Sequence, residues 1–273
     1  MKNLTVPCLI NLDFESQHSP PSDTPQIVVP GAPHAPLHHF QARAAHATSV
    51  YRGTAITARA GLGRLETAVA AAAESLNTRH EVEHVIVLTS LTHLENAAKV
   101  ITKAAAVDVR KVTSQNSVKY RSLRESRWIV APYSMLTRVT PVLLELAPSS
   151  LVLFDLAHHV QRLSSQRTQS ARQVAALSAR RIALLGAGNM TTRDLASVIT
   201  GLVDPELAVI PATFLATLAG PAGPCSPTTL LRAHREQFDL TDAQLDLAIA
   251  MAPTWYSPLT QLVETVALLR PRA

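Results

Sequence analysis

Short runs of mostly apolar residues recur along the middle of the chain and read as strands. They lie at 53–58, 84–90, 108–114, 127–133, 151–155 and 181–187. They are continuously apolar rather than alternating, which is typical of strands with both faces buried. Helical stretches separate most of these runs, at 64–77, 92–106, 134–146, 166–179 and 191–203. The alternation predicts an α/β fold, with a mostly parallel sheet and helices on both faces.

The same pattern divides the chain into three parts. Residues 1–38 are rich in proline, serine and histidine with little periodicity, so we expect an extended or disordered arm. Residues 39–215 carry the alternation of strands and helices, and residues 216–273 hold a loop-rich segment and C-terminal helices. In these helices Thr241 and Ser257 are N-cap candidates and Pro258 begins a helix. We therefore expect a small C-terminal helical appendage that packs on the core or binds a partner.

The composition says more about the core, the compartment and the partners of the protein than about any reaction that it catalyses. Hydrophobic residues make up 47% of the 273 positions and aromatic residues only 4%, so the core must consist largely of Ala, Val, Leu and Ile. The net charge of +5 is compatible with a phosphate-backbone partner, although a solvated basic surface explains it equally well. Cys8 and Cys225 are far apart, which favours a reducing, cytoplasmic setting. No run reaches the roughly 18 apolar residues of a membrane span, so no membrane partner is expected.

A glycine-rich turn joins the run at 53–58 to an alanine-rich helix. Gly61 and Gly63 would let backbone N–H groups close around a phosphate at the helix N-terminus. A functional phosphate loop also needs Lys followed by Ser or Thr after the last glycine, whereas this chain has Arg64 and Leu65. Taken alone, the two glycines could equally make a tight turn between strand and helix.

Further segments follow this turn in an informative order. They are LTSLTHLENAAKVITK, WIVAPYSMLTR, LVLFDLAHHVQRLSSQRTQSARQVAAL, RRIALLGAGN and LASVITGLVDPEL. Together they resemble the first RecA-like lobe of the Swi/Snf family of DNA-dependent ATPases, a branch of the superfamily-two helicases. The resemblance covers about residues 40–215 and is strongest in APYSML and DLAHHVQRLSSQRTQSAR. Phe40 and Gln41 stand where the family has its adenine-recognising glutamine.

The resemblance implies a nucleotide site made by Gln41, Gly61, Gly63 and Arg64, with ATP or ADP and Mg²⁺ as its ligands. In the family, the lysine of the phosphate loop binds the β- and γ-phosphates, and the next threonine coordinates Mg²⁺. Arg64 keeps the charge but is a planar fork rather than a compact ammonium. Leu65 offers no oxygen to a metal. Thr67 lies two positions further along the helix, where we expect it to be a poor substitute.

A second departure follows the run at 151–155. Asp155 matches the aspartate of the family's DEAH-like box and could hold a metal through water, or merely cap the next turn. Leu156 stands where the family has the glutamate that positions or activates the attacking water. His158 and His159 remain, either as site groups or as hydrogen-bonded polar groups at a sheet edge. The GTP-like turn of the family has become GAG at 186–188 and lacks its threonine.

We therefore expect a degenerate lobe that does not hydrolyse ATP on its own. A positioned general base typically contributes about 10²- to 10⁴-fold to a rate, and we find no second lobe in the sequence. The favoured hypothesis is a regulatory module that binds DNA, or a protein partner such as a helicase or a replication or repair factor. The alternatives are one half of a split DNA-dependent ATPase that needs a partner lobe, and a decoy inhibitor of a helicase or replication protein. Arg64 and Leu65 leave open whether nucleotide still binds.

Overall fold

The computed structural model of the chain describes residues 8–12, 27–29, 32–113, 120–160, 164–186 and 198–203. The predicted C-terminal appendage, with Thr241, Ser257 and Pro258, lies outside these residues. The strands are β1 (Cys8–Asn11), β2 (Ile27–Val29), β3 (Ala32–Leu37), β4 (Gly53–Ala58), β5 (His84–Thr89), β6 (Arg110–Lys111), β7 (Trp128–Pro132), β8 (Ser150–Phe154) and β9 (Arg180–Gly186).

The predicted helices at 64–77, 92–106, 134–146 and 166–179 are confirmed, whereas the helices at 39–50 and 120–124 were not predicted. Of the predicted helix at 191–203, the structure describes residues 198–203. The α-helices are α2 (His39–Val50), α3 (Arg64–Thr78), α4 (Leu94–Ala105), α5 (Tyr120–Arg124), α6 (Leu136–Leu146) and α7 (Gln166–Leu177). Short helices are η1 (Leu91–His93), η2 (Tyr133–Met135), η3 (Ala147–Ser149), η4 (Ala157–Val160) and the π-helix η5 (Ile199–Val203). Among the described residues, no helix is long and apolar enough to cross a membrane.

The main sheet has seven strands in the order β1-β4-β9-β8-β5-β7-β6, and every pair of neighbours is parallel. The prediction of a parallel α/β sheet is thus confirmed. The run at 53–58 matches β4, and the run at 108–114 contributes only the two-residue strand β6.

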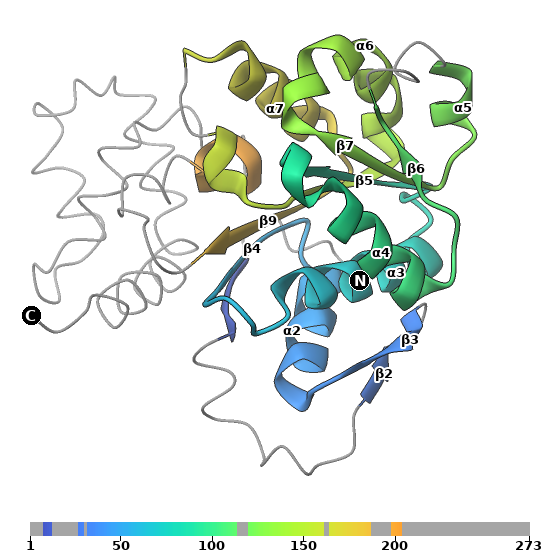
Figure 1. The fold of residues 1–273 in the computed structure, drawn as a ribbon. Coiled ribbons are helices and arrows are strands. Elements are labelled where there is room, and N and C mark those ends of the chain that lie inside the picture. The colour runs from blue at the N-terminus through green and yellow to red at the C-terminus, as the bar shows by residue number, and fades with distance from the viewer. Residues whose placement is uncertain are drawn as a thin grey trace, which may run out of the picture.

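Helices cover both faces of this sheet: α2, α3 and α4 lie on one face, and α5, α6 and α7 on the other (Figure 1). Successive residues of a strand point to opposite faces. In β5, Val85 and Val87 join the buried cluster that includes α3, whereas Ile86 and Leu88 join the cluster that includes α6. Burial on both faces is therefore the physical reason for the continuously apolar runs in the sequence.

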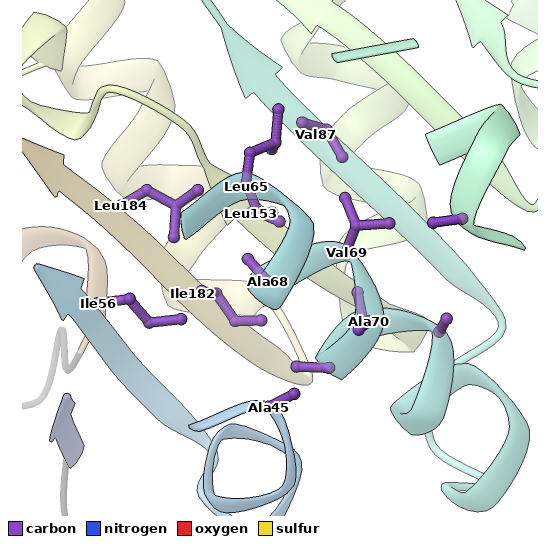
Figure 2. Packing of buried hydrophobic residues seen from close by; sticks show 14 of the residues in the cluster. Ala45, Ile56, Leu65, Ala68, Val69, Ala70, Val87, Leu153, Ile182 and Leu184 are labelled. Atoms are coloured by element: carbon purple, nitrogen blue, oxygen red, sulfur yellow. The ribbon is translucent and has the colours of Figure 1, made fainter. Parts of the chain in front are cut away.

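Alanines let α3 approach the sheet closely. Ala68, Ala70 and Val69 are fully buried, in one cluster with Ile182 and Leu184 of β9 (Figure 2). Small side chains on a helix permit a short distance between its backbone and the layer below. The close packing of α3 fixes the position of its first turn, which begins at Arg64.

Some elements were not anticipated by the sequence pattern. β1 lies within the predicted arm and pairs with β4, so it becomes an edge strand of the main sheet. β2 and β3 form a separate antiparallel pair, and β3 packs against α3 and α4. The three-part division of the chain stays a prediction.

Candidate functional site

The candidate residues gather at the carboxyl edge of the sheet. Because the strands are parallel, β4, β5, β7, β8 and β9 all end at this edge, where ligands of open α/β sheets usually bind. The Nη1 of Arg64 donates to the carbonyl of Ala58 at 3.4 Å, and a Cβ at Gly186 would lie 3.4 Å from the same nitrogen. Arg64 thus reaches over the ends of β4 and β9.

The loop before α3 depends on glycine at two positions. Gly61 has a φ of +90° and Gly63 a φ of +68°, conformations that residues with a side chain rarely adopt. A Cβ at Gly63 would lie 2.2 Å from Nε2 of Gln41, whereas a Cβ at Gly61 would meet nothing within 4 Å. This geometry accounts for the tight turn. The predicted phosphate contact of both glycines stays a prediction.

Gln41 ties this loop to the start of α2. Its Oε1 accepts a 2.9 Å hydrogen bond from the backbone N–H of His38, and its Nε2 donates a 3.0 Å bond to the carbonyl of Leu62. The side chain is buried. Both ends of the amide therefore have protein partners, and this supports the loop. The predicted contact of Gln41 with adenine is not tested by these bonds.

The first turn of α3 offers no hydroxyl at its start. Leu65 is buried and belongs to the same cluster as Leu153 and Leu184 (Figure 2). The Oγ1 of Thr67 donates a 2.9 Å bond to the carbonyl of Gly63, and Thr67 is also buried. As expected from its position, Thr67 does not replace the missing hydroxyl. Arg64 is half-buried in this turn, and Glu66 is exposed.

Asp155 is held at the end of β8 by its neighbours. Its Oδ2 accepts a 2.7 Å bond from the Thr89 hydroxyl, and its carbonyl accepts a 2.8 Å bond from the hydroxyl of Tyr133. Asp155 and Tyr133 are both buried. Burial raises the pKa of Tyr133 well above its usual value, and the Asp155 carboxylate raises it further. Tyr133 therefore stays protonated and keeps donating at any physiological pH.

Leu156 turns the chain from β8 into η4. It is buried and has a φ of +53°, a left-handed conformation that costs a residue with a side chain roughly 1 to 2 kcal/mol. The predicted place of the catalytic glutamate is thus filled by a buried apolar side chain. Asp155 directly before it retains a carboxylate.

His158 and His159 form a close pair next to Arg64 and Tyr133. Their ring centroids are 4.6 Å apart, and the ring of His159 lies 6.1 Å from that of Tyr133. Burial is the largest cause that lowers the pKa of His158, and the charges of His159 and Arg64 are smaller causes. Burial is also the largest cause that lowers the pKa of His159, and the charges of Arg167 and His93 lower it further. The Asp155 carboxylate opposes both shifts without reversing them, so the pKa of each histidine lies below its usual value.

Several site residues were not singled out from the sequence. Thr89 and Tyr133 complete the surroundings of Asp155, and Arg167 in the first turn of α7 acts on His159. Thr89 and Tyr133 stand at the ends of the apolar runs at 84–90 and 127–133. Polar residues at the carboxyl ends of parallel strands are a signal that could have identified both.

The donor groups at this edge fit an anion better than a metal ion. The first N–H groups of α3 and the guanidinium of Arg64 suit a phosphate. Mg²⁺ prefers oxygen ligands, but Leu65 has none and the hydroxyl of Thr67 is bound to Gly63. Asp155 supplies a carboxylate that Thr89 already engages. Within the described ranges, no three His, Cys, Asp or Glu residues come together to hold a metal. The residues present therefore fit a phosphate group and do not fit Mg²⁺ beside it.

Comparison with other proteins identifies the fold. No protein-family model matches the sequence, and no curated protein matches it. The SWI2/SNF2 ATPase core of Sulfolobus solfataricus, solved in complex with dsDNA, has a TM-score of 0.54 and 15% identity, over 88% of this chain and 62% of that chain. This chain thus spans less than two thirds of that protein's length.

Two structures of the UvsW helicase from bacteriophage T4 are more distant. One has a TM-score of 0.43 and 14% identity over 54% of this chain and 51% of that chain. The other has a TM-score of 0.45 and 12% identity over 63% and 33%. The parallel sheet order, the glycine loop before α3 and the similarity to the S. solfataricus core agree, and the chain has the fold of a helicase-like RecA-type lobe.

Proposed function

We propose that this chain is a DNA-binding regulatory lobe that does not hydrolyse ATP. The observation that carries the proposal is the burial of Leu65 and Leu156 at the predicted places of the Mg²⁺ ligand and the general base. Both leucines pack into the protein, so neither place is open for a substitute group from a neighbouring residue. The scaffold persists around them, with Asp155 held by Thr89.

The loss of these groups is large enough to abolish useful turnover. A general base typically contributes about 10²- to 10⁴-fold to a rate. Mg²⁺ in phosphoryl transfer neutralises developing charge and orients the phosphates, and that contribution needs a hydroxyl that Leu65 does not have. Arg64 supplies charge, but a planar guanidinium does not reproduce the compact contact of an ammonium. Such losses are not additive, yet each one alone is severe.

A basic face of α4 is the proposed contact for DNA. Lys99 and Lys103 lie one turn apart and are exposed, together with Asn96 on the same side of the helix. This face continues the exposed turn η1 (Leu91–His93) at the carboxyl edge of the sheet. Lysines and polar side chains of this kind bind phosphates without reading the sequence. The S. solfataricus structure contains dsDNA, which supports DNA as the partner proposed here.

The test measures DNA binding and ATP hydrolysis on the full chain. We expect no ATP hydrolysis above background with or without DNA. We expect the parent chain to bind DNA, with an affinity that falls as the salt concentration rises. In Lys99→Glu and Lys103→Glu, the slope of log K against log salt concentration should become shallower by about 0.9 for each DNA phosphate that is no longer neutralised. Arg127→Glu makes a comparable charge reversal at an exposed residue before β7, outside α4, and serves as the control. DNA-stimulated hydrolysis, or equal effects of all three variants, contradicts the proposal.

A further inference from the structure

Cationic and titratable side chains from three elements converge around Asp155. Arg64 comes from α3, His158 and His159 come from η4, and Arg167 comes from α7. Arg64 acts electrostatically on His158, and Arg167 acts on both His159 and Tyr133. The carboxylate that faces this group is Asp155, which is buried and already accepts a hydrogen bond from Thr89. Positive charge thus exceeds negative charge here once the histidines are protonated.

Arg167 provides a second sign of a missing partner. Its Nε is buried and makes no hydrogen bond within the part of the chain that the structure describes. A buried donor without an acceptor destabilises the protein. An anionic oxygen between α7 and η4 would satisfy this nitrogen, and guanidinium groups bind phosphate oxygens particularly well.

We propose that this edge binds the pyrophosphate group of a nucleoside diphosphate or of inorganic pyrophosphate without a divalent cation. Arg64, Arg167 and the histidine pair take over the countercharge that Mg²⁺ supplies in an active motor lobe. The first N–H groups of α3 add donors for one phosphate. Leu65 excludes the metal ligand while leaving these donors in place. This inference goes beyond the proposed DNA binding and does not rest on it.

Proton uptake accompanies this binding. The groups that face the site are Arg64, His93, Tyr133, Asp155, His158, His159 and Arg167, with Glu66 on the Gln41 side of the glycine loop. A bound phosphate favours the charged form of both histidines. The affinity should therefore rise as the pH falls from 8 to 6, because the free histidines are largely neutral at the start.

The experiment is calorimetric titration of the full chain with ADP, with inorganic pyrophosphate and with adenosine, in EDTA or in excess Mg²⁺. We expect ADP and pyrophosphate to bind in EDTA, adenosine to bind far more weakly, and Mg²⁺ to give no gain in affinity. Arg64→Gln should weaken binding at least tenfold, and Arg167→Gln several-fold. Arg127→Gln, at the opposite edge of the sheet, should leave binding unchanged.

A second variant keeps the test independent of folding defects. His158→Gln should bind ADP at pH 8 with the affinity of the parent chain and lose most of the gain between pH 8 and pH 6. Binding that requires Mg²⁺, no binding of either phosphate ligand in EDTA at pH 6, or equal binding by Arg64→Gln each overturns the inference. Adenosine binding as tight as ADP binding also overturns it. Failure to bind DNA bears only on the proposed function.

Discussion

The hydroxyl of Thr89 donates a 2.7 Å hydrogen bond to Oδ2 of Asp155 and joins β5 to β8 at the edge of the sheet that carries the candidate site. Both residues are buried. The backbone repeats the link, because the N–H of Asp155 donates to the carbonyl of Leu88 at 2.8 Å. The carboxylate is therefore fixed in place by the sheet itself, whether or not a ligand reaches it.

Thr89→Val should destabilise the protein by about 2 kcal/mol, because the buried carboxylate loses its hydroxyl donor while the shape of the side chain is kept. Urea denaturation followed by circular dichroism measures the change. The double variant Thr89→Val/Asp155→Leu should lose less than the sum of the two single variants, since it leaves no carboxylate to satisfy. Strict additivity would mean that the bond does not contribute.

Gly63→Ala should cost about 2 to 3 kcal/mol of stability, and Gly61→Ala only about 1 kcal/mol. Both residues have a positive φ, and an alanine in such a conformation is strained by about 1 kcal/mol. At Gly63 the new methyl group also displaces the amide of Gln41 and breaks its bond to Leu62. Thermal denaturation of the two variants side by side compares these costs. Equal losses would exclude a structural role for the Gln41 contact.

The sequence predicts those elements of the fold whose burial determines which positions are apolar. The run at 53–58 became β4 because a strand buried on both faces must be apolar throughout. α2 was not anticipated, since histidine, threonine and serine interrupt its alanines and no clear stripe results. β1 was missed as well, because three apolar residues carry no information about their pairing with β4.

The site residues likewise divide into those that local sequence features identify and those that only the folded chain brings together. Arg64 and Asp155 were identified because they follow a glycine loop and a buried strand, features that are local in sequence. Arg167 is twelve residues from Asp155 in sequence (167 − 155), and its proximity to His159 depends on how α7 returns across the sheet. The close, tilted packing of the His158 and His159 rings likewise follows from the turn at Leu156, which only its left-handed backbone reveals.

The stability of the protein should fall as the pH drops below about 6.5. The pKa of His158 and that of His159 lie below the ordinary value of 6.5 in the folded state. Below 6.5 the unfolded chain therefore binds more protons than the folded chain, and the free energy of unfolding decreases until the folded pKa values are passed. The change is measured by urea denaturation at pH 5 to 8. The variant His158→Gln/His159→Gln should lose part of this slope; an unchanged slope would contradict the shifts.

Leu65→Thr should restore a response to Mg²⁺ at a cost in stability. The hydroxyl would stand at the predicted metal-ligand position, while the loss of buried apolar packing against Leu153 and Leu184 should cost about 1 to 2 kcal/mol. Leu65→Val has the same shape as threonine without the oxygen and should lose similar stability. In calorimetric titration, Mg²⁺ should tighten ADP binding several-fold only for Leu65→Thr. ATP hydrolysis should stay absent, because Leu156 still occupies the place of the general base. A Mg²⁺ response that is equal in the parent chain, Leu65→Val and Leu65→Thr would show that Leu65 does not determine metal binding.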